Sequence, residues 1–270
     1  MRTTTIAAAT VLTAALIVPS HATGQSWGFP GLSNQEFAKV SGGPAPKRDL
    51  TGAWDPGQAG IAGGENYFTA RNVPPMTPLG QEMVARNKAG HGPYAAKVFE
   101  GNDPLTTRGD PSGFPRMVNY EFRPIRIVHT PKAVLMLYSF NQTWRIIWTD
   151  GRKLPDDPDP RWFGYSVGRW DDDYTFVVDT VGMTDRTWVD SGGFPHSEKL
   201  RVEERYRRTS ANVVELTVTI DDPLVYAKPW LSRDRLPLKR LPDDTDFLEQ
   251  VYAASEVQGF KEDVSDKTKN

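Results

Sequence analysis

The sequence contains no cysteine, few histidines and no strong excess of charge of either sign. Without cysteine the chain cannot form disulfides, so packing alone has to hold the fold even in an oxidising compartment. The formal net charge of −2 gives no electrostatic reason to expect binding to nucleic acid. After the first twenty residues no apolar run approaches the ~18 residues of a membrane-spanning helix, which predicts no membrane insertion.

The residues that commonly bind metals and cofactors are also sparse. The three histidines that follow the leader segment, His91, His129 and His196, do not have the spacing of metal ligands. The acidic run at residues 156–159 lacks the glycine and the spacing of a calcium-binding loop. The glycines of residues 57–63 do not fit a phosphate-binding fingerprint. The sequence therefore predicts neither a metal nor an organic cofactor.

The first residues have the pattern of a secretory signal peptide. Arg2 supplies the positive charge, residues 6–18 are apolar, and Ser20 and Ala22 are small residues at positions −3 and −1 of a cleavage site. A single arginine argues against the twin-arginine route. We therefore expect residues 1–22 to be a Sec signal peptide, cleaved after Ala22, and the mature protein to be soluble and periplasmic or secreted.

Between residues 133 and 221 the sequence reads as consecutive strands separated by turn-rich connections. The segments are AVLMLYSFNQTWRIIWTDGR, RWFGYSVGRW, YTFVVDTVGM, EKLRVEERYRR and VVELTVTIDD. Residues 133–149 are interpreted as one strand, either face of which could point inward. MVNYEFR and PIRIVH before these segments, and LVYAKPW after them, bring the total to seven or eight strands. The pattern predicts a mainly β fold, an antiparallel meander that closes into a lipocalin-like β-barrel, with one or two short peripheral helices.

Four regions follow from this reading. Residues 1–22 form the signal peptide, and residues 23–116 form a loop-rich N-terminal region packed on the barrel. That region includes a short first strand at residues 49–54 and a short helix near 78–89, begun by Thr77 and Pro78. Residues 117–231 form the barrel. Residues 232–270 form a C-terminal extension, with a loop at 232–243 and a possible helix at 244–258.

Strand alternation singles out Glu204. In LRVEERYRR one face carries Leu200, Val202, Glu204 and Tyr206, and the other carries mostly charged residues. The apolar face has to point inward, and it takes Glu204 with it. A carboxylate inside a barrel has to pair, accept several hydrogen bonds or take a proton. Glu204 is therefore a candidate acid–base residue, and a structural ion pair is the alternative interpretation.

Further candidates for the site lie on the neighbouring strand and in a loop. Arg145 and Asn141 fall on the same face of the interpreted strand 133–149 and would offer hydrogen-bond donors to an apolar cavity. His196 follows a glycine-containing loop and is the natural acid–base group at neutral pH, although a structural role is common for such a residue. Trp148 and Trp188 are the candidate aromatic contacts for a substrate.

The segment GYSVG, residues 164–168, matches the nucleophile-elbow pattern of serine hydrolases around Ser166. Asp185, Asp190 and His196 follow in the order of that family. An elbow requires a helix directly after the serine, and here another strand follows instead. The glycines are therefore interpreted as marking a bend or close packing within a strand.

Several long segments resemble a family of secreted bacterial proteins usually labelled hypothetical. They are the run from IIWTDGRKLPDDPDPRWFGYSVGRW to GGFPHSEKLRVEERYRR, then TIDDPLVYAKPW, and upstream DLTGAWDP, TPLGQEMVARNKAGHGP and GNDP…DPSGFPR. The resemblance covers most of the mature chain and implies export but no activity. Members often carry one cysteine near GNDP…DPSGFPR and another near the C-terminus. Here Arg108-Gly109 and Ala253-Ala254 occupy those regions, so the chain resembles a divergent member without that disulfide.

These observations predict an exported enzyme that performs acid–base chemistry without a cofactor, as a lyase, isomerase or dehydratase. Its substrate would be a small hydrophobic or aromatic molecule inside the barrel. Glu204 and His196 would transfer protons, while Arg145, Asn141 and Tyr206 would orient the substrate or stabilise an oxyanion. The alternative is a non-catalytic carrier of a small hydrophobic ligand. A serine hydrolase is the third possibility. The oligomeric state is not predicted.

Overall fold

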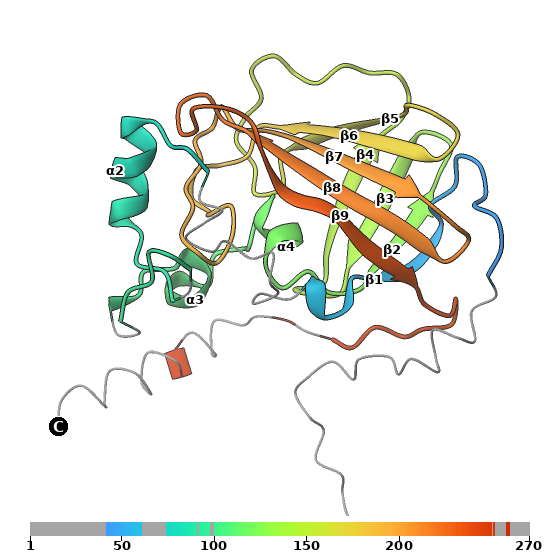
Figure 1. Ribbon diagram of the computed structural model, residues 1–270, viewed down its shortest axis with the longest axis horizontal. Coiled ribbons are helices and arrows are strands. Elements are labelled where there is room, and N and C mark those ends of the chain that lie inside the picture. The colour runs from blue at the N-terminus through green and yellow to red at the C-terminus, as the bar shows by residue number, and fades with distance from the viewer. Residues whose placement is uncertain are drawn as a thin grey trace, which may run out of the picture. The chain divides into compact units, whose positions relative to one another are not determined.

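The computed structural model describes residues 42–60, 74–90, 92–97, 100–249, 251 and 258–259. Within them, strands β1 to β9 form one closed barrel in which each strand lies beside its neighbours in sequence (Figure 1). Strand β9 pairs with β1 and closes the barrel. The predicted mainly β fold with a closed, lipocalin-like barrel is confirmed. The predicted signal peptide, residues 1–22, lies outside the described residues.

Two seams of the barrel, β9–β1 and β4–β5, pair over only two positions each, and the second of them is also parallel. The strands are β1 (Gly52–Asp55), β2 (Ile125–His129), β3 (Ala133–Tyr138), β4 (Thr143–Trp148), β5 (Tyr165–Trp170), β6 (Thr175–Val181), β7 (Arg201–Arg208), β8 (Val213–Asp221) and β9 (Trp230–Arg240). Strands β4 and β5 run parallel and pair over only two positions, Ile147 with Ser166 and Trp148 with Val167. The other pairings are antiparallel. The meander is therefore interrupted once, at β4–β5.

The barrel extends beyond the predicted core of residues 117–231. Its first strand, β1, belongs to the predicted N-terminal region, and its last, β9, runs through the predicted loop at 232–243. Register shifts near Val218 and a positive φ at Arg235 break the alternation of β9. This irregularity explains why the segment reads as a loop in the sequence. Residues 244–249, part of the predicted C-terminal helix, are not helical.

Two of the shorter predicted strands are wrong. MVNYEFR contains the short helix α4 (Arg116–Asn119), whose four residues are all buried. A run buried on all sides carries no periodicity that separates a strand from a helix. LVYAKPW is a turn, because the Asp222 carboxylate accepts a hydrogen bond from the Leu224 amide and holds the chain bent.

The predicted early helix is confirmed as α2 (Pro78–Arg86). The Thr77 side chain accepts a hydrogen bond from the Gly80 amide, and Pro78 occupies the first turn. Helix α3 (Pro104–Arg108) and the 3-10 turn η1 (Gly57–Ala59) are shorter. Helix α4 lies at one end of the barrel (Figure 1), and Met117 and Val118 on it belong to the hydrophobic core.

The segment interpreted as one strand over 133–149 is a hairpin of β3 and β4. Asn141 and Gln142 both have positive φ, which gives a tight turn between the two strands. The turn changes which sequence positions point inward, so Met136 on β3 lies opposite Arg145 on β4. Arg145 is therefore inside the barrel, whereas Trp144 next to it is 59% exposed on the outside.

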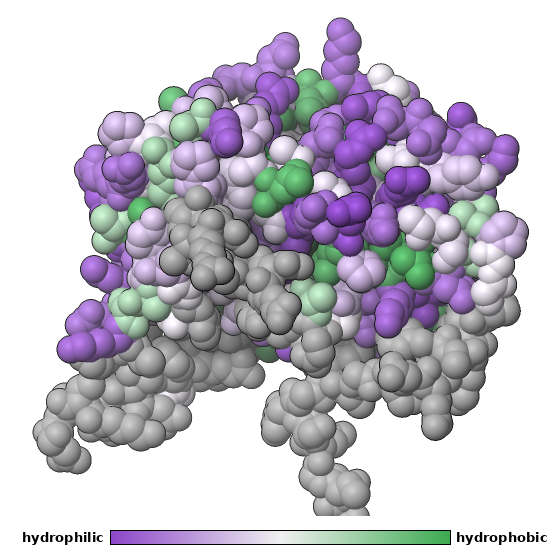
Figure 2. Space-filling view, viewed as in Figure 1, coloured by the Kyte–Doolittle hydropathy of each residue, from purple (hydrophilic) through white to green (hydrophobic). Residues whose placement is uncertain are grey.

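Inside and outside are clearly divided on the long strands. In β7, Val202, Glu204 and Tyr206 are buried, as the alternation predicts. Figure 2 shows that hydrophilic side chains cover most of the face over β7–β9, with apolar side chains in small separate patches. Among the described residues, no helix has the length and apolar character required to cross a membrane.

Candidate functional site

The centre of the barrel contains a buried ion pair between Arg145 of β4 and Glu204 of β7. Arg145 Nη1 donates to Glu204 Oε1 at 3.1 Å, and Nη2 donates to Oε2 at 2.8 Å. Both side chains are almost completely buried. A planar guanidinium and a carboxylate in this two-bond arrangement form the strongest common type of ion pair. Alternation correctly predicted that Glu204 points inward.

Three hydroxyls and a second tyrosine complete this network. Tyr206 donates to Glu204 Oε1 at 2.7 Å. Arg145 donates to the hydroxyl oxygens of Tyr138, Ser166 and Thr180 at 3.0–3.2 Å. Oε1 of Glu204 therefore accepts two hydrogen bonds and Oε2 accepts one, all of them from side chains of the barrel interior.

The electrostatics keep Arg145, Tyr138 and Tyr206 protonated. Burial disfavours the Arg145 cation, but attraction to Glu204 outweighs it and raises the pKa of the guanidinium. Burial raises the pKa of Tyr138 to about 12, and that of Tyr206 lies well above its ordinary value, also because of burial. The two phenols therefore stay protonated near neutral pH and act as hydrogen-bond partners.

The gap at the β4–β5 seam forms a crevice of about 600 Å³. One wall is formed by residues 142–146 and Trp148, and the other by residues 161–166. Five of the lining side chains are aromatic: Trp144, Trp148, Trp162, Phe163 and Tyr165. The buried residues Arg145 and Ser166 also line it, so the crevice adjoins the central network. Volumes of this size and aromatic linings are typical of small-molecule sites.

Gly164 allows the second wall to bend away from β4. Its φ is +63°, and a Cβ there would lie 2.6 Å from both Met183 Sδ and the Val181 carbonyl oxygen. We expect Gly164→Ala to lower the free energy of unfolding by about 2–3 kcal/mol, from the left-handed backbone and overpacking together. Gly151→Ala is the control, since Gly151 also has positive φ but no atom lies near its Cβ, and about 1 kcal/mol is expected. Equal losses in urea unfolding would contradict a packing role for Gly164.

His196 lies in a different environment from Glu204. Its Nε2 is 3.0 Å from the Thr187 hydroxyl and its Nδ1 is 3.2 Å from the Ser197 carbonyl oxygen. Burial lowers the pKa of His196, although Asp222 and Asp185 oppose this. In the part of the chain that the structure describes, no hydrogen bond or ion pair joins His196 to Glu204, and His196 does not line the crevice. The structure does not bring the two predicted proton-transfer residues together.

The other predicted site residues do not lie together in one site. Tyr206 belongs to the network, and Trp148 lines the crevice with the Arg152 guanidinium 3.6 Å from its ring centre. Asn141 is in the β3–β4 turn and not in the interior, because the hairpin interrupts the assumed strand. Trp188 is buried in the 182–197 loop, 5.7 Å from the Arg116 guanidinium carbon.

Ser166 does not have the geometry of a catalytic serine. It lies within β5, and its hydroxyl is 2.9 Å from the Thr180 hydroxyl and accepts from Arg145. No histidine contacts it among the described residues. Gly168 in the same motif packs tightly, since a Cβ there would lie 2.3 Å from the Phe176 ring. The interpretation of the motif as a strand with closely packed glycines is confirmed.

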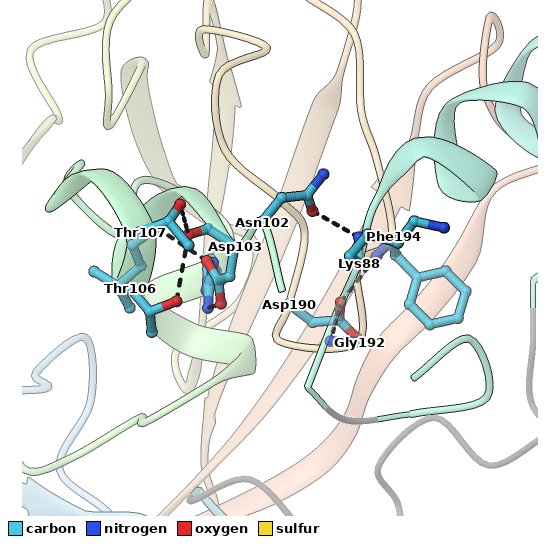
Figure 3. Close-up of polar contacts among 10 residues, drawn as sticks. Lys88, Asn102, Asp103, Thr106, Thr107, Asp190, Gly192 and Phe194 are labelled. Carbon is cyan, nitrogen blue, oxygen red and sulfur yellow. Dashed lines mark hydrogen bonds and ion pairs between the residues drawn. The ribbon is translucent and has the colours of Figure 1, made fainter. Parts of the chain in front are cut away.

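Asp190 is named from the sequence only as an acid that follows Ser166 in the hydrolase order, and the burial of its carboxyl group is not predicted there. Its Oδ1 accepts from the amides of Gly192 and Phe194 at 2.9 and 3.2 Å (Figure 3). Its Oδ2 is buried and has no hydrogen-bond partner. Burial raises the pKa of Asp190 to about 7, against the effects of these amides and of Arg116. The sequence Asp-Ser-Gly-Gly-Phe signals the turn, but it does not reveal the burial.

Arg116 does not neutralise Asp190, because it already has a carboxylate partner. Its two terminal nitrogens donate to the two Asp103 carboxylate oxygens at 2.7 and 2.6 Å. The Asp103 backbone oxygen accepts from Thr106 and Thr107, which fixes Asp103 at the start of α3 (Figure 3). Within the described residues no group of three or more histidine, aspartate or glutamate side chains is arranged to hold a metal ion.

Comparison of the chain with protein-family models, with curated proteins and with solved structures gave no match.

Proposed function

We propose that this protein binds a small aromatic or flat apolar molecule in the crevice between β4 and β5, as an exported carrier. The observation that supports this most directly is the aromatic lining of the crevice of about 600 Å³ at the short, parallel seam between β4 and β5. Aromatic side chains bind flat apolar ligands through large contact areas and stacking. The signal-peptide pattern of residues 1–22 supports export to the periplasm or beyond.

The central network supports binding over acid–base catalysis. Glu204 accepts three hydrogen bonds from Arg145 and Tyr206 and does not line the crevice, and among the described residues His196 contacts neither of them. A general base has to be within hydrogen-bond reach of the proton that it removes. We therefore assign Glu204 and Arg145 to the structural ion pair that is the alternative reading of this strand.

An acid–base lyase or isomerase remains the second candidate, and one observation favours it. Arg145 lines the crevice, and its Nε is buried without a hydrogen-bond partner, so one N–H is left for an oxyanion that develops on a bound substrate. Incubation of the protein with a ligand that co-purifies with it distinguishes the two functions. Recovery of the ligand unchanged supports the carrier, and its conversion supports the enzyme.

Replacement of Trp144 tests the location of the site. Trp144 lines the crevice and is 59% exposed, so Trp144→Ala should leave the fold intact. We expect it to weaken ligand binding about five- to tenfold, from lost contact area and stacking. The measurement is isothermal titration with a ligand identified by mass spectrometry of the purified protein, or with 2-naphthamide as a probe.

Leu137→Ala is the matched control. Leu137 lies directly opposite Trp144 on β3 and is 38% exposed, but it does not line the crevice. Its replacement should leave affinity unchanged within about twofold, since it removes apolar surface from the same outer face without touching the ligand. Equal effects of the two substitutions, or none from Trp144→Ala, would place the ligand elsewhere.

A further inference from the structure

Among the described residues, three arginines lie over aromatic rings that line the crevice, and one of them, Arg161, has no acidic partner there. Arg152 lies over Trp148 and pairs with Asp150. Arg186 lies over Trp162 and pairs with Asp110. Arg161 lies over Tyr165, with its guanidinium carbon 3.8 Å from the ring centre.

Arg161 offers a cation whose hydrogen-bonding edge is unused. Within the described part of the chain, its side chain forms no ion pair and no hydrogen bond. A guanidinium stacked on a ring contacts it through its face, while its N–H groups point outward in the plane. Those donors therefore stay available to a ligand that lies beside Tyr165.

The position of Arg161 is fixed by the backbone. Its amide donates to the Gly182 carbonyl at 2.9 Å, and its own carbonyl accepts from the Thr184 amide at 2.9 Å. Pre-organised donors bind more tightly because less conformational freedom is lost on binding. Arg161 itself is exposed and lines the crevice, and the contact of its guanidinium with the Tyr165 ring places the cation at the edge of the crevice.

The described residues that line the crevice carry a net positive charge. No aspartate or glutamate lines the crevice, and the charge of Arg145, the other arginine there, is neutralised by Glu204. Arg161 therefore gives the crevice one uncompensated positive charge beside five aromatic rings.

We propose that the ligand of the crevice is an aromatic or flat apolar carboxylate, and that Arg161 binds its carboxylate group. The planar fork of a single guanidinium matches the two oxygens of a carboxylate. Its single positive charge balances the one negative charge of a carboxylate, whereas a phosphate monoester dianion brings a second negative charge that no other uncompensated cation of the described lining balances. This inference rests on the proposed binding function and adds the chemical class of the ligand.

The test compares two probes of the same shape, 2-naphthoate and 2-naphthamide, by isothermal titration at 150 mM salt, where distant charges are largely screened. We expect the wild-type protein to bind 2-naphthoate about tenfold more tightly than 2-naphthamide, because charge-assisted hydrogen bonds are the stronger ones. Arg161→Gln should abolish this preference, because only 2-naphthoate loses a charge-assisted partner and its affinity therefore falls about tenfold further than that of 2-naphthamide. A far-UV circular dichroism spectrum confirms that the variant is folded.

Arg152→Gln is the matched control, because Arg152 also lies over a crevice ring but has a carboxylate partner. It should keep the tenfold preference. Three results overturn the assignment of Arg161 while the binding function stands: equal binding of both probes, equal losses in the two variants, or tighter binding of 2-naphthyl phosphate than of 2-naphthoate. Absence of binding by any probe overturns the binding function as well.

Discussion

Glu204→Gln is expected to lower the free energy of unfolding by about 3–5 kcal/mol, since it strands the Arg145 cation inside the barrel without its counter-charge. The amide keeps one oxygen for the Tyr206 hydroxyl, but it cannot accept two bonds from the guanidinium fork. Urea unfolding of the purified variant measures the loss. An acid–base role for Glu204 predicts the opposite result, a stable protein that has lost turnover.

A double-mutant cycle measures the interaction energy between Arg145 and Glu204 separately from the other contacts of each side chain. Arg145→Met should also cost about 3–5 kcal/mol, because it leaves a buried carboxylate. The double variant should cost clearly less than the sum of the single costs, with Tyr138 retaining some penalty for its lost donor. Additive costs would contradict a direct ion pair.

The surface pair of Arg169 and Asp179 supplies the comparison. It joins β5 to β6 in the same barrel, but both side chains are partly exposed. Asp179→Asn should cost no more than about 1 kcal/mol, since water screens exposed charges and solvates them when they are separated. A cost equal to that of Glu204→Gln would mean that burial does not determine the strength of the central pair.

Sequence alternation alone predicts the barrel and the inward direction of Glu204 and Tyr206 in its central network. In β7 the apolar positions at Val202 and Tyr206 leave no doubt about the inner face, and Glu204 shares it. In residues 133–149 both faces are apolar, so nothing in the pattern marks the hairpin at Asn141 and Gln142. The missed turn is why Asn141 was assigned to the interior.

Other features depend on contacts that no local pattern reveals. Arg233 looks like a loop residue in the sequence, yet it points inward from β9. Its guanidinium donates to backbone carbonyls of Ala59, Val118 and Asn119, which are more than 100 residues away in the sequence. These acceptors replace water around a buried cation and make a charged residue possible inside the barrel. The crevice likewise results from the pairing of β4 with β5, which only the closed barrel determines.

Asp190→Asn is expected to stabilise the protein at alkaline pH and to have little effect in acid. Burial holds the pKa of Asp190 at about 7, above the ordinary value of 3.8. The stability that the protonated carboxyl provides is therefore complete below pH 3.8 and is lost as the pH rises through 7, because the unfolded chain releases the proton more readily. One pH unit corresponds to about 1.4 kcal/mol, so the ionised carboxylate costs on the order of 4 kcal/mol at pH 8.5.

Asparagine removes this cost and keeps the local contacts. Its oxygen accepts from the amides of Gly192 and Phe194 as Oδ1 does, and its NH2 group replaces the Oδ2 hydroxyl of the protonated acid. The variant should exceed the wild-type protein by about 3–4 kcal/mol at pH 8.5 and by less than about 1 kcal/mol at pH 4. Urea unfolding at the two pH values gives both differences.

The partners of the two nearby arginines explain why burial still raises the pKa of Asp190. Arg116 is committed to Asp103, and Arg233 to backbone carbonyls, so neither contributes a hydrogen bond to the carboxylate. Asp179→Asn, at an exposed carboxylate, should show no such gain between pH 4 and pH 8.5. If Asp190→Asn instead destabilises the protein at pH 8.5, the folded protein stabilises the ionised carboxylate, and one of these two arginines has to leave its present partner to reach it.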